Sequence, residues 1–317
     1  MTMTTAQPAQ TGGLGAGRAP RGRRRTQPRS GSSRVVGQKW WTPYLFMLPG
    51  LGFFVFMFAW PALLTFQLSV SQYNIVDPIQ FVGADNFLHL LTDPRFHRAL
   101  ANSMIFLVLF LPLAVIIPLF LAVLVNQKVP GIQTFRVLYY LPVVTSMVAV
   151  AVAWRYLLGR EGVVNWILGL VGVPPISFLL DTAWALPTVV MIEGWKNMGL
   201  FMMIYLAGLQ AIPAELIEAA KVDGASPWRR LIHVIVPGIL PWVTVTLTMG
   251  MLEAMRSFES IFMLTRGGPQ DSTLTLGYYI WHLAFEKYDM GYASTVGLVL
   301  WVIMIVLALL NQKVTNR

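Results

Sequence analysis

Long apolar runs separated by shorter polar segments form the dominant pattern of this chain. A membrane-spanning helix needs about 20 consecutive apolar residues. Six runs reach that length, and they cover 44–70, 101–126, 136–158, 184–208, 238–264 and 291–311. Prolines lie in or near several of the runs, and each removes one backbone hydrogen bond. The pattern predicts an all-α, polytopic membrane protein with six transmembrane helices, some of them bent.

The overall composition supports a membrane location and argues against an enzyme. Of 317 residues, 56% are hydrophobic and only 12% are charged, which leaves too little polar surface to cover a soluble globule of this size. The chain contains no cysteine and no G-x-x-x-x-G-K-[ST] phosphate loop. Its four histidines, His89, His97, His233 and His282, show no metal-ligand spacing and are expected to be solvated or interfacial. We therefore expect no catalytic residue, no metal site and no cofactor bound by this chain.

Residues 1–39 differ sharply from the rest of the chain. They are rich in Gly, Pro, Ser, Thr and Arg, and they carry too few large apolar side chains to fold alone. We predict a disordered basic tail over 1–39 and a transmembrane domain over 40–317. Because Lys and Arg mark the cytoplasmic side of a span, the tail predicts that both termini lie in the cytoplasm. The basic cluster is interpreted as fixing topology beside anionic lipid rather than as binding nucleic acid.

A polar segment at about 212–237 connects the fourth and fifth apolar runs. Pro213 is expected at the first position of a short helix, and Gly224 is expected to end that helix in a left-handed conformation. Ser226 and Pro227 then begin a second helix. The alternative interpretation is an ordinary amphipathic cytoplasmic loop.

This helix-glycine-helix segment resembles the EAA loop found in the membrane subunits of bacterial ATP-binding-cassette importers. The family pattern is EAA, three residues, Gly, nine residues and Ile-x-Leu-Pro. The chain keeps that spacing from Glu218 to Pro237, with Val234 and Val236 in place of Ile and Leu. In the family the loop inserts into a cleft of the ATPase. The resemblance implies that coupling to an ATPase is carried by Glu218, Ala219, Ala220, Asp223, Gly224 and Pro237.

Further segments over about 41–317 are similar to the carbohydrate-uptake branch of these permeases, which includes the larger maltose-transporter permease and glycerol-3-phosphate permeases. The matching segments are 43–49, 81–87, 206–213, 264–269 and 289–294. The resemblance implies a type I importer permease fold in the bacterial inner membrane. It also implies a second permease as heterodimer partner, two cytoplasmic ATPase subunits that hold ATP and Mg, and an external solute-binding protein that delivers a sugar.

Charged residues inside two of the apolar runs mark a candidate substrate path. A charge at the centre of a membrane helix costs about 2.5–3.5 kcal/mol on insertion scales, so each needs a partner or an aqueous path. The candidates are Glu193, Trp195, Lys196 and Asn197 on the fourth run, and Gly250, Glu253, Arg256 and Ser257 on the fifth. Acceptor groups suit the hydroxyls of a sugar, and an aromatic ring suits its apolar face. The alternative is that Glu193 with Lys196, and Glu253 with Arg256, neutralise each other within one helix.

Three functional alternatives stay open at this point. Lys196 and Arg256 would favour a phosphorylated solute such as glycerol-3-phosphate, but the two glutamates oppose it. A membrane-embedded glycosyl-transfer enzyme would use Glu193 or Glu253 as a general base. A passive channel would leave the segment 212–237 unexplained. We predict the membrane-spanning permease of a sugar importer, working by alternating access and powered by separate ATPase subunits.

Overall fold

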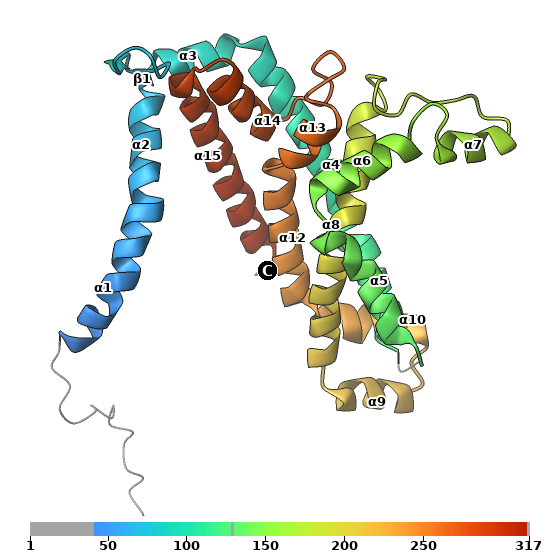
Figure 1. Ribbon diagram of the computed structural model, residues 1–317. Helices are drawn as coiled ribbons and strands as arrows, with labels where there is room; N and C mark the ends of the chain where they lie inside the picture. Colours follow the sequence, from blue (N-terminus) through green and yellow to red (C-terminus); the bar gives the residue numbers. More distant parts are fainter. Residues whose placement is uncertain (1–40, 128–129, 316–317) are drawn as a thin grey trace, which may run out of the picture. The chain divides into compact units, whose positions relative to one another are not determined.

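A computed structural model describes residues 41–127 and 130–315 (Figure 1). The backbone packs as two units, residues 1–54 and 55–317, and each is described by itself. The described part of the first unit contains helix α1 (Thr42–Phe54), which has no buried residue. This division falls inside the first predicted span, whereas we placed the domain boundary at 39/40. The predicted basic tail lies outside the described residues.

Among the described residues of the second unit, the regular secondary structure is helical apart from one short hairpin, in agreement with the all-α prediction. The hairpin pairs β1 (Ser71–Gln72) with β2 (Gln80–Phe81) in antiparallel register. The helical segments are η1 (Val55–Ala59), α2 (Trp60–Ser69), α3 (Asp85–Thr92), α4 (Pro94–Val125), α5 (Ile132–Val144), α6 (Met147–Leu157), α7 (Val163–Leu170), α8 (Ala185–Ala211), α9 (Ala214–Val222), α10 (Pro227–Arg230), η2 (Leu231–Ile235), α11 (Val236–Gly238), α12 (Leu240–Met255), α13 (Glu259–Leu264), α14 (Leu276–Trp281), η3 (His282–Glu286) and α15 (Met290–Thr315).

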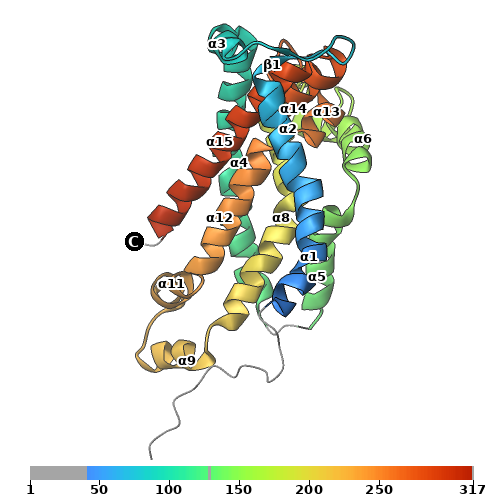
Figure 2. The ribbon, with the colours of Figure 1, turned by 90° about the vertical axis from the view of Figure 1, so that its left-hand side faces the viewer.

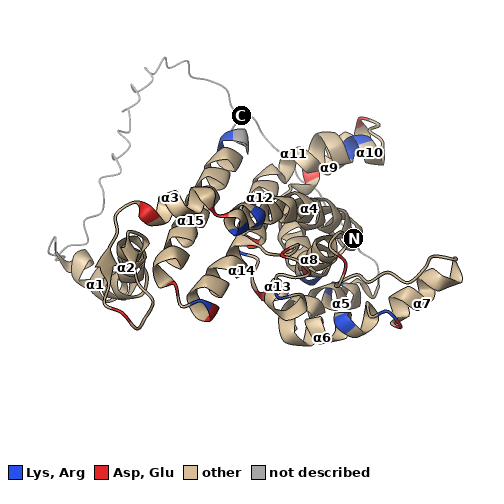
Figure 3. Ribbon diagram, turned by 90° about the horizontal axis from the view of Figure 1, so that it is seen from above, with Lys and Arg blue, Asp and Glu red and all other residues tan. Residues whose placement is uncertain are grey.

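The predicted spans divide into unbroken helices and bent pairs. Three stretches are long and apolar enough to cross a membrane alone: Thr42–Ser69, Pro94–Val125 and Met290–Lys313. The number rises to six if each bent pair of helices counts as one span. Seen from above, Lys, Arg, Asp and Glu are sparse along the helices and gather toward their ends and the loops (Figure 3).

Two predicted spans are wrong as continuous helices. The run 136–158 is two helices, α5 and α6, which meet at an angle of 101°. Thr145 has an extended backbone there, and the Ser146 hydroxyl accepts a hydrogen bond from the Ala149 amide at 3.3 Å, so it caps a new helix. The run 238–264 breaks after Met255 and resumes at Glu259. Hydropathy averaged over about 20 residues does not reveal such breaks, because the few polar residues at each break are outweighed by the apolar residues farther out.

Helices α4, α8 and α12 run side by side and form the centre of the second unit (Figure 2). Phe106 and Phe110 on α4 are fully buried, and the ring of Phe110 lies 6.3 Å from that of Phe201 on α8. Close approach depends on small residues, because a Cβ added to Gly194 would lie 2.7 Å from the Leu113 side chain. Glycine at such contacts is typical of membrane helices, which gain most of their association energy from close packing. This packing fixes the position of α8, which carries half of the candidate substrate path.

Gly291, near the start of α15, provides a test of the packing between α15 and β1. A Cβ there would overlap the Ser71 carbonyl, whereas a Cβ on Gly297 of the same helix would have nothing within 4 Å. We expect Gly291→Ala to destabilise the protein by about 1–3 kcal/mol, the usual cost of overpacking. Gly297→Ala is the matched control and is expected to be neutral or stabilising, because alanine favours helix. The measurement is the apparent melting temperature of each purified variant, and equal melting temperatures would contradict the packing.

Candidate functional site

The segment that resembles the EAA loop folds as predicted around Gly224. Gly224 has a φ of 75°, and its amide donates to the Lys221 carbonyl at 3.1 Å. The Ala225 amide donates to the Ala220 carbonyl at 3.0 Å. These two bonds and the left-handed glycine form a Schellman cap that ends α9. Pro213 precedes the helix as its N-cap residue rather than occupying the first helical position, which corrects our prediction by one residue.

The second half of the segment also begins where the sequence predicts. The Ser226 hydroxyl accepts a hydrogen bond from the Arg229 amide at 3.3 Å, and Pro227 follows at the start of α10. From α10 the chain continues through η2 into α11, which contains Pro237. Figure 1 shows α9 beyond the end of α8 and α10 near that end, both on the opposite side of the second unit from α3 and α14.

Helices α9 and α10 have no buried residue. Glu218, Ala219, Asp223, Gly224 and Pro237 are exposed, and Ala220 is half-buried. Large apolar side chains are exposed beside them: Val222 is 88% exposed and Trp228 is 68% exposed. A water-facing loop rarely leaves such side chains uncovered, and a contiguous exposed apolar patch marks a contact with another macromolecule. This surface therefore has the character of a docking element.

The fourth-span candidates separate onto two faces of α8. Glu193 is buried, and it lies beside Ser260 and within electrostatic range of Glu253, Lys196 and Glu259. The Asn197 amide donates to the Glu193 carbonyl at 3.1 Å and to its carboxylate at 3.4 Å. Glu193 and Asn197 thus lie on one face, directed toward the junction of α12 and α13. The structure brings Glu193 and Glu253 into the same neighbourhood.

Trp195 and Lys196 lie on a different face of α8. The Trp195 ring contacts the Trp154 ring of α6 edge-on at 5.5 Å, and the Lys196 ammonium reaches the Val143 carbonyl at 3.5 Å. Both contacts are made with the bent α5–α6 pair. Trp195 and Lys196 are therefore separated from Glu193 and Asn197, and the four do not form a single lining.

The fifth-span candidates are divided in a similar way. Gly250 packs against Ala114 and Leu111 of α4, so our placement of Gly250 on a path-lining stripe is corrected. Ser257 lies beyond the end of α12, where its carbonyl accepts from the Thr275 hydroxyl at 2.8 Å. Glu253 and Arg256 are exposed, beside the break between α12 and α13.

The positions of these charged groups bear on the alternative that the charges neutralise each other within one helix. Among the described residues, neither Glu193 with Lys196 nor Glu253 with Arg256 forms an ion pair within 4.0 Å. Lys196 contacts a backbone carbonyl instead. In the same described residues, no group of three or more His, Asp or Glu side chains is arranged to hold a metal ion.

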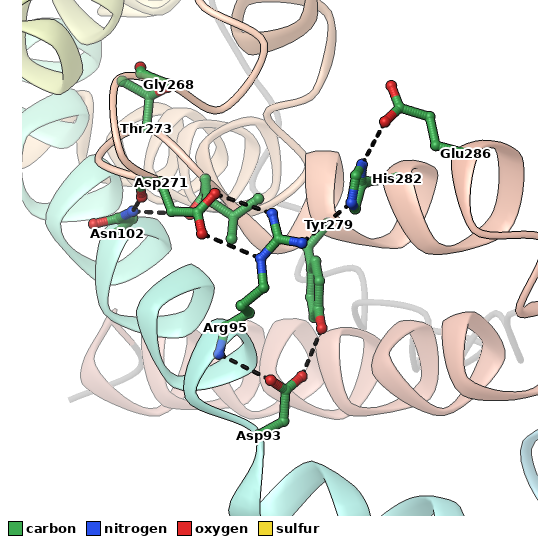
Figure 4. Close-up of polar contacts among 10 residues, drawn as sticks. Asp93, Arg95, Asn102, Gly268, Asp271, Thr273, Tyr279, His282 and Glu286 are labelled. Atoms are coloured by element: carbon green, nitrogen blue, oxygen red, sulfur yellow. Dashed lines mark hydrogen bonds and ion pairs between the residues drawn. The ribbon is translucent and has the colours of Figure 1, made fainter.

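A polar network that the sequence did not reveal joins the start of α4 to the loop before α14 (Figure 4). Arg95 donates to both carboxylate oxygens of Asp271, from Nε at 3.1 Å and from Nη2 at 3.0 Å. Arg95 Nη1 also lies 3.2 Å from Nε2 of His282, and Nδ1 of His282 lies 2.7 Å from the Glu286 carboxylate. Because arginine only donates, Nε2 of His282 accepts and Nδ1 carries the proton toward Glu286. We expected His282 to be solvated or interfacial, and the structure shows it half-buried and bonded within this network.

Asp93 forms the second half of this network. Its carboxylate accepts from the Arg95 amide at 2.9 Å, and so caps α4. It also accepts from the hydroxyls of Tyr279 at 2.6 Å and Tyr292 at 2.8 Å. Burial alone raises the pKa of Asp93, but the hydrogen bonds from both tyrosines and from the backbone hold that pKa below its usual range. Asp93 therefore connects α4, α14 and α15 through one ionised carboxylate.

Two neighbours on α4 complete the attachment of the loop. The Asn102 amide donates to the carbonyls of Asp271 at 2.8 Å and Leu274 at 3.0 Å. The Ser103 hydroxyl accepts from the Leu276 amide at 2.9 Å. Local signals for this network existed at Asp93 and Pro94, which together form an N-cap and proline helix start. The partners of Asp93 lie nearly 200 positions away, so no short sequence window contains both sides.

Comparison with known proteins identifies the family. A profile described as "Binding-protein-dependent transport system inner membrane component" matches residues 92–317. The chain belongs to this family. The lactose transport system permease protein LacF of Rhizobium radiobacter is 33% identical to this permease over 295 residues, covering 90% of the permease and 97% of LacF. The sn-glycerol-3-phosphate transport system permease protein UgpA of Pectobacterium atrosepticum is 32% identical over 292 residues, covering 90% and 98%.

Solved structures agree with this assignment. The permease is similar to a chain of a bacterial ABC transporter described as importing the acidic polysaccharide alginate, with a TM-score of 0.77 and 26% identity. The match covers 87% of the permease and 96% of that chain. A second structure shows the alginate transporter in complex with a periplasmic protein that holds an alginate pentasaccharide, and its TM-score is 0.76. The type I importer permease fold that we predicted is confirmed, and the interpretation as a glycosyl-transfer enzyme is not retained.

Removing one hydroxyl from the Asp93 network tests its contribution to the permease. We expect Tyr279→Phe to lower stability by about 1.5–3 kcal/mol at neutral pH, the usual value of a hydrogen bond to a charged group. Tyr278→Phe, one residue earlier in α14, is the matched control, because no hydrogen bond is formed by the Tyr278 hydroxyl among the described residues. The pKa of Asp93 is lowered in the folded permease, so its stabilisation persists at mildly acid pH and disappears only as the pH falls through that lowered value. Thermal unfolding across pH is the measurement, and equal losses in both variants would contradict the assignment.

Proposed function

We propose that this chain is the permease subunit of an ATP-binding-cassette importer that moves a sugar or oligosaccharide by alternating access. The observation that carries the proposal is the uncovered α9–α10 surface, because its helix cap and exposed apolar residues suit insertion into another protein. Family membership supports the same role. In this proposal the ATPase subunits bind ATP and Mg, and this chain binds no cofactor.

The proposal includes further partners of defined chemistry. A second permease covers the exposed edge of α12 that carries Glu253 and Arg256. Two ATPase subunits bind the cytoplasmic loops of the two permeases. An external solute-binding protein delivers the sugar, by analogy with the periplasmic protein in the alginate transporter complex.

Orientation follows from the distribution of positive charge. The basic residues of the tail precede the first span, and Lys221, Arg229 and Arg230 lie on the α9–α10 segment. We propose that this end of the molecule faces the cytoplasm, and that β2, α3 and α14 face the outside. Both termini are then cytoplasmic.

Single cysteines test this orientation in a chain that has none. Val76, between β1 and β2, and Val222, the last residue of α9, are each 88% exposed. Figure 1 shows β1 and α9 at opposite ends of the second unit. We expect Val76→Cys to react with a membrane-impermeant maleimide added to intact cells. Val222→Cys is expected to react only after the membrane is opened, in cells that lack the ATPase. The reverse labelling pattern would mean that the topology is inverted.

The coupling role of the α9–α10 surface depends on the left-handed conformation of Gly224. A Cβ on Gly224 has nothing within 4 Å, so a substitution there acts through the backbone alone. We expect Gly224→Val to insert normally and to reduce solute-stimulated ATP hydrolysis at least tenfold, because a β-branched residue opposes a positive φ. Gly224→Asn is the matched control and is expected to retain most activity, because asparagine tolerates that conformation. Equal activity in both variants would exclude the coupling role.

The neighbourhood of Glu193 is the part of the structure that best suits a hydroxyl-rich substrate. Glu193 and Asn197 provide acceptors and donors at membrane depth, while Glu253, Arg256 and Glu259 stand exposed at the adjoining helix break. We propose that this group lines the path between the two permeases. The positive charge of Arg256 suits a phosphate, so glycerol-3-phosphate is kept as the alternative substrate. Carboxylates outnumber cations around Arg256, however, and they repel a phosphate. A neutral sugar is therefore the first proposal.

Charge-neutral substitution distinguishes a path-lining role from a structural one. We expect Glu193→Gln and Glu253→Gln to keep the yield of assembled complex near normal. Each is expected to lower the transport rate per molecule about tenfold, because the sugar loses hydrogen bonds from its hydroxyls to the carboxylates as it crosses the membrane. Glu161→Gln, on an exposed loop, is the control. The readout is uptake of labelled solute, normalised to the amount of complex. Normal rates with reduced yield would assign both glutamates to structure alone.

A further inference from the structure

Two cavities lie next to each other at the end of α6, one toward α7 and α8 and the other toward α13 and the loop before α8. The first has a volume of about 460 Å³ and an apolar lining that includes Trp154, Trp184, Pro187 and Met191. The second has a volume of about 440 Å³. Leu158 and Phe178 line both cavities, so the two lie side by side.

The second cavity differs from the first in its charge. Its lining contains two charged residues, and both are arginines: Arg155 and Arg160. Arg155 Nη2 already donates to the carbonyls of Met263 and Leu264 at the end of α13. Arg160 has no hydrogen bond or ion pair among the described residues. The acidic residues nearest in sequence, Glu161 and Asp181, do not line this cavity. An apolar cavity thus lies beside a cavity that carries positive charge.

Helix α7, which borders the apolar cavity through Val164, buries its polar residue and exposes its apolar residues. Its one polar residue, Asn165, is buried, and its side chain bonds to the Gly159 carbonyl at 2.9 Å and to both backbone groups of Ile176. Its apolar residues face outward instead: Trp166 is 65% exposed and Leu170 is 68% exposed. A short helix with an outward apolar face and a tryptophan is typical of the boundary between headgroups and acyl chains. Figure 1 shows α7 on the side of α8 opposite α9.

We propose that these cavities form a binding site for one anionic phospholipid of the leaflet opposite α9. The phosphate of the headgroup binds beside Arg160 and Arg155, and an acyl chain occupies the apolar cavity between Trp154 and Trp184. Charge complementarity selects an anionic lipid, because an arginine close to the membrane surface attracts it. Asn165 stabilises the site because its side chain connects Gly159, before α7, to Ile176, after α7. The site is independent of the proposed sugar path and of the α9–α10 surface.

Photo-crosslinking of the assembled complex tests the proposal. The probe is phosphatidylglycerol with a diazirine at the end of its acyl chain, present as a minor component of phosphatidylcholine nanodiscs. Crosslinked peptides are mapped by mass spectrometry. We expect them to concentrate on the segments that contain Trp154, Trp184 and Met191, and we expect the same diazirine on phosphatidylcholine to give a weaker, scattered pattern.

Variants separate the contributions of the headgroup and the acyl chain. Arg160→Gln is expected to lower the phosphatidylglycerol yield at these segments about fivefold, the usual effect of one arginine at an anionic surface. Arg98→Gln removes another exposed arginine outside the cavities, and it should leave the yield unchanged. Met191→Trp should fill the apolar cavity and lower the yield with both arginines intact. Because Arg155 also holds α13, it is left unchanged.

Two results would overturn the proposal. One is an equal yield from both lipids that does not respond to Arg160→Gln, which would indicate ordinary lipid contact. The other is crosslinking in the isolated chain that disappears in the assembled complex, which would show that a protein subunit covers the cavities instead.

Discussion

Hydrogen bonding of the backbone at helix breaks is the constraint on which the rest of this permease depends. Away from water, each unpaired amide or carbonyl costs several kcal/mol, so a buried chain that leaves its helix needs side chains to replace the lost bonds. For the loop between α13 and α14, helix α4 provides these side chains. Asn102 donates to two carbonyls of the loop, and the Ser103 hydroxyl accepts from the Leu276 amide. Asp93 and Arg95 then hold the C-terminal half of α14 through Tyr279 and the C-cap residue His282.

The same constraint determines where charge can be placed. The break between α12 and α13 ends the helix beside Glu253 and Arg256, which leaves these groups at an exposed edge rather than within continuous apolar packing. Glu193 faces this junction from α8. At the other end of α8, the chain turns at Pro213 into helices with no buried residue. The packed centre of α4 and α8 therefore separates a polar junction from a docking surface.

The features that the sequence could predict are those encoded locally. Apolar runs locate the spans, and the spacing from Glu218 to Pro237 identifies the docking segment, because a left-handed glycine and a serine cap act within a few residues. The breaks at Thr145 and after Met255 were missed, because hydropathy averages over them. The Asp93 network was missed for a different reason: its members lie far apart in sequence, and each alone resembles an ordinary loop residue. Gly250 was misassigned because helical spacing cannot tell which neighbour a face meets.

ATP-driven uptake by reconstituted proteoliposomes is the most direct test of this account. The permease is co-purified with its second permease and ATPase, and supplied with the solute-binding protein and labelled oligosaccharide at the side opposite α9. The account predicts accumulation of the oligosaccharide in the lumen above its external concentration, and only when ATP is present at the α9 side. Equilibration of the solute across the membrane without ATP would contradict it, because that behaviour belongs to a passive channel.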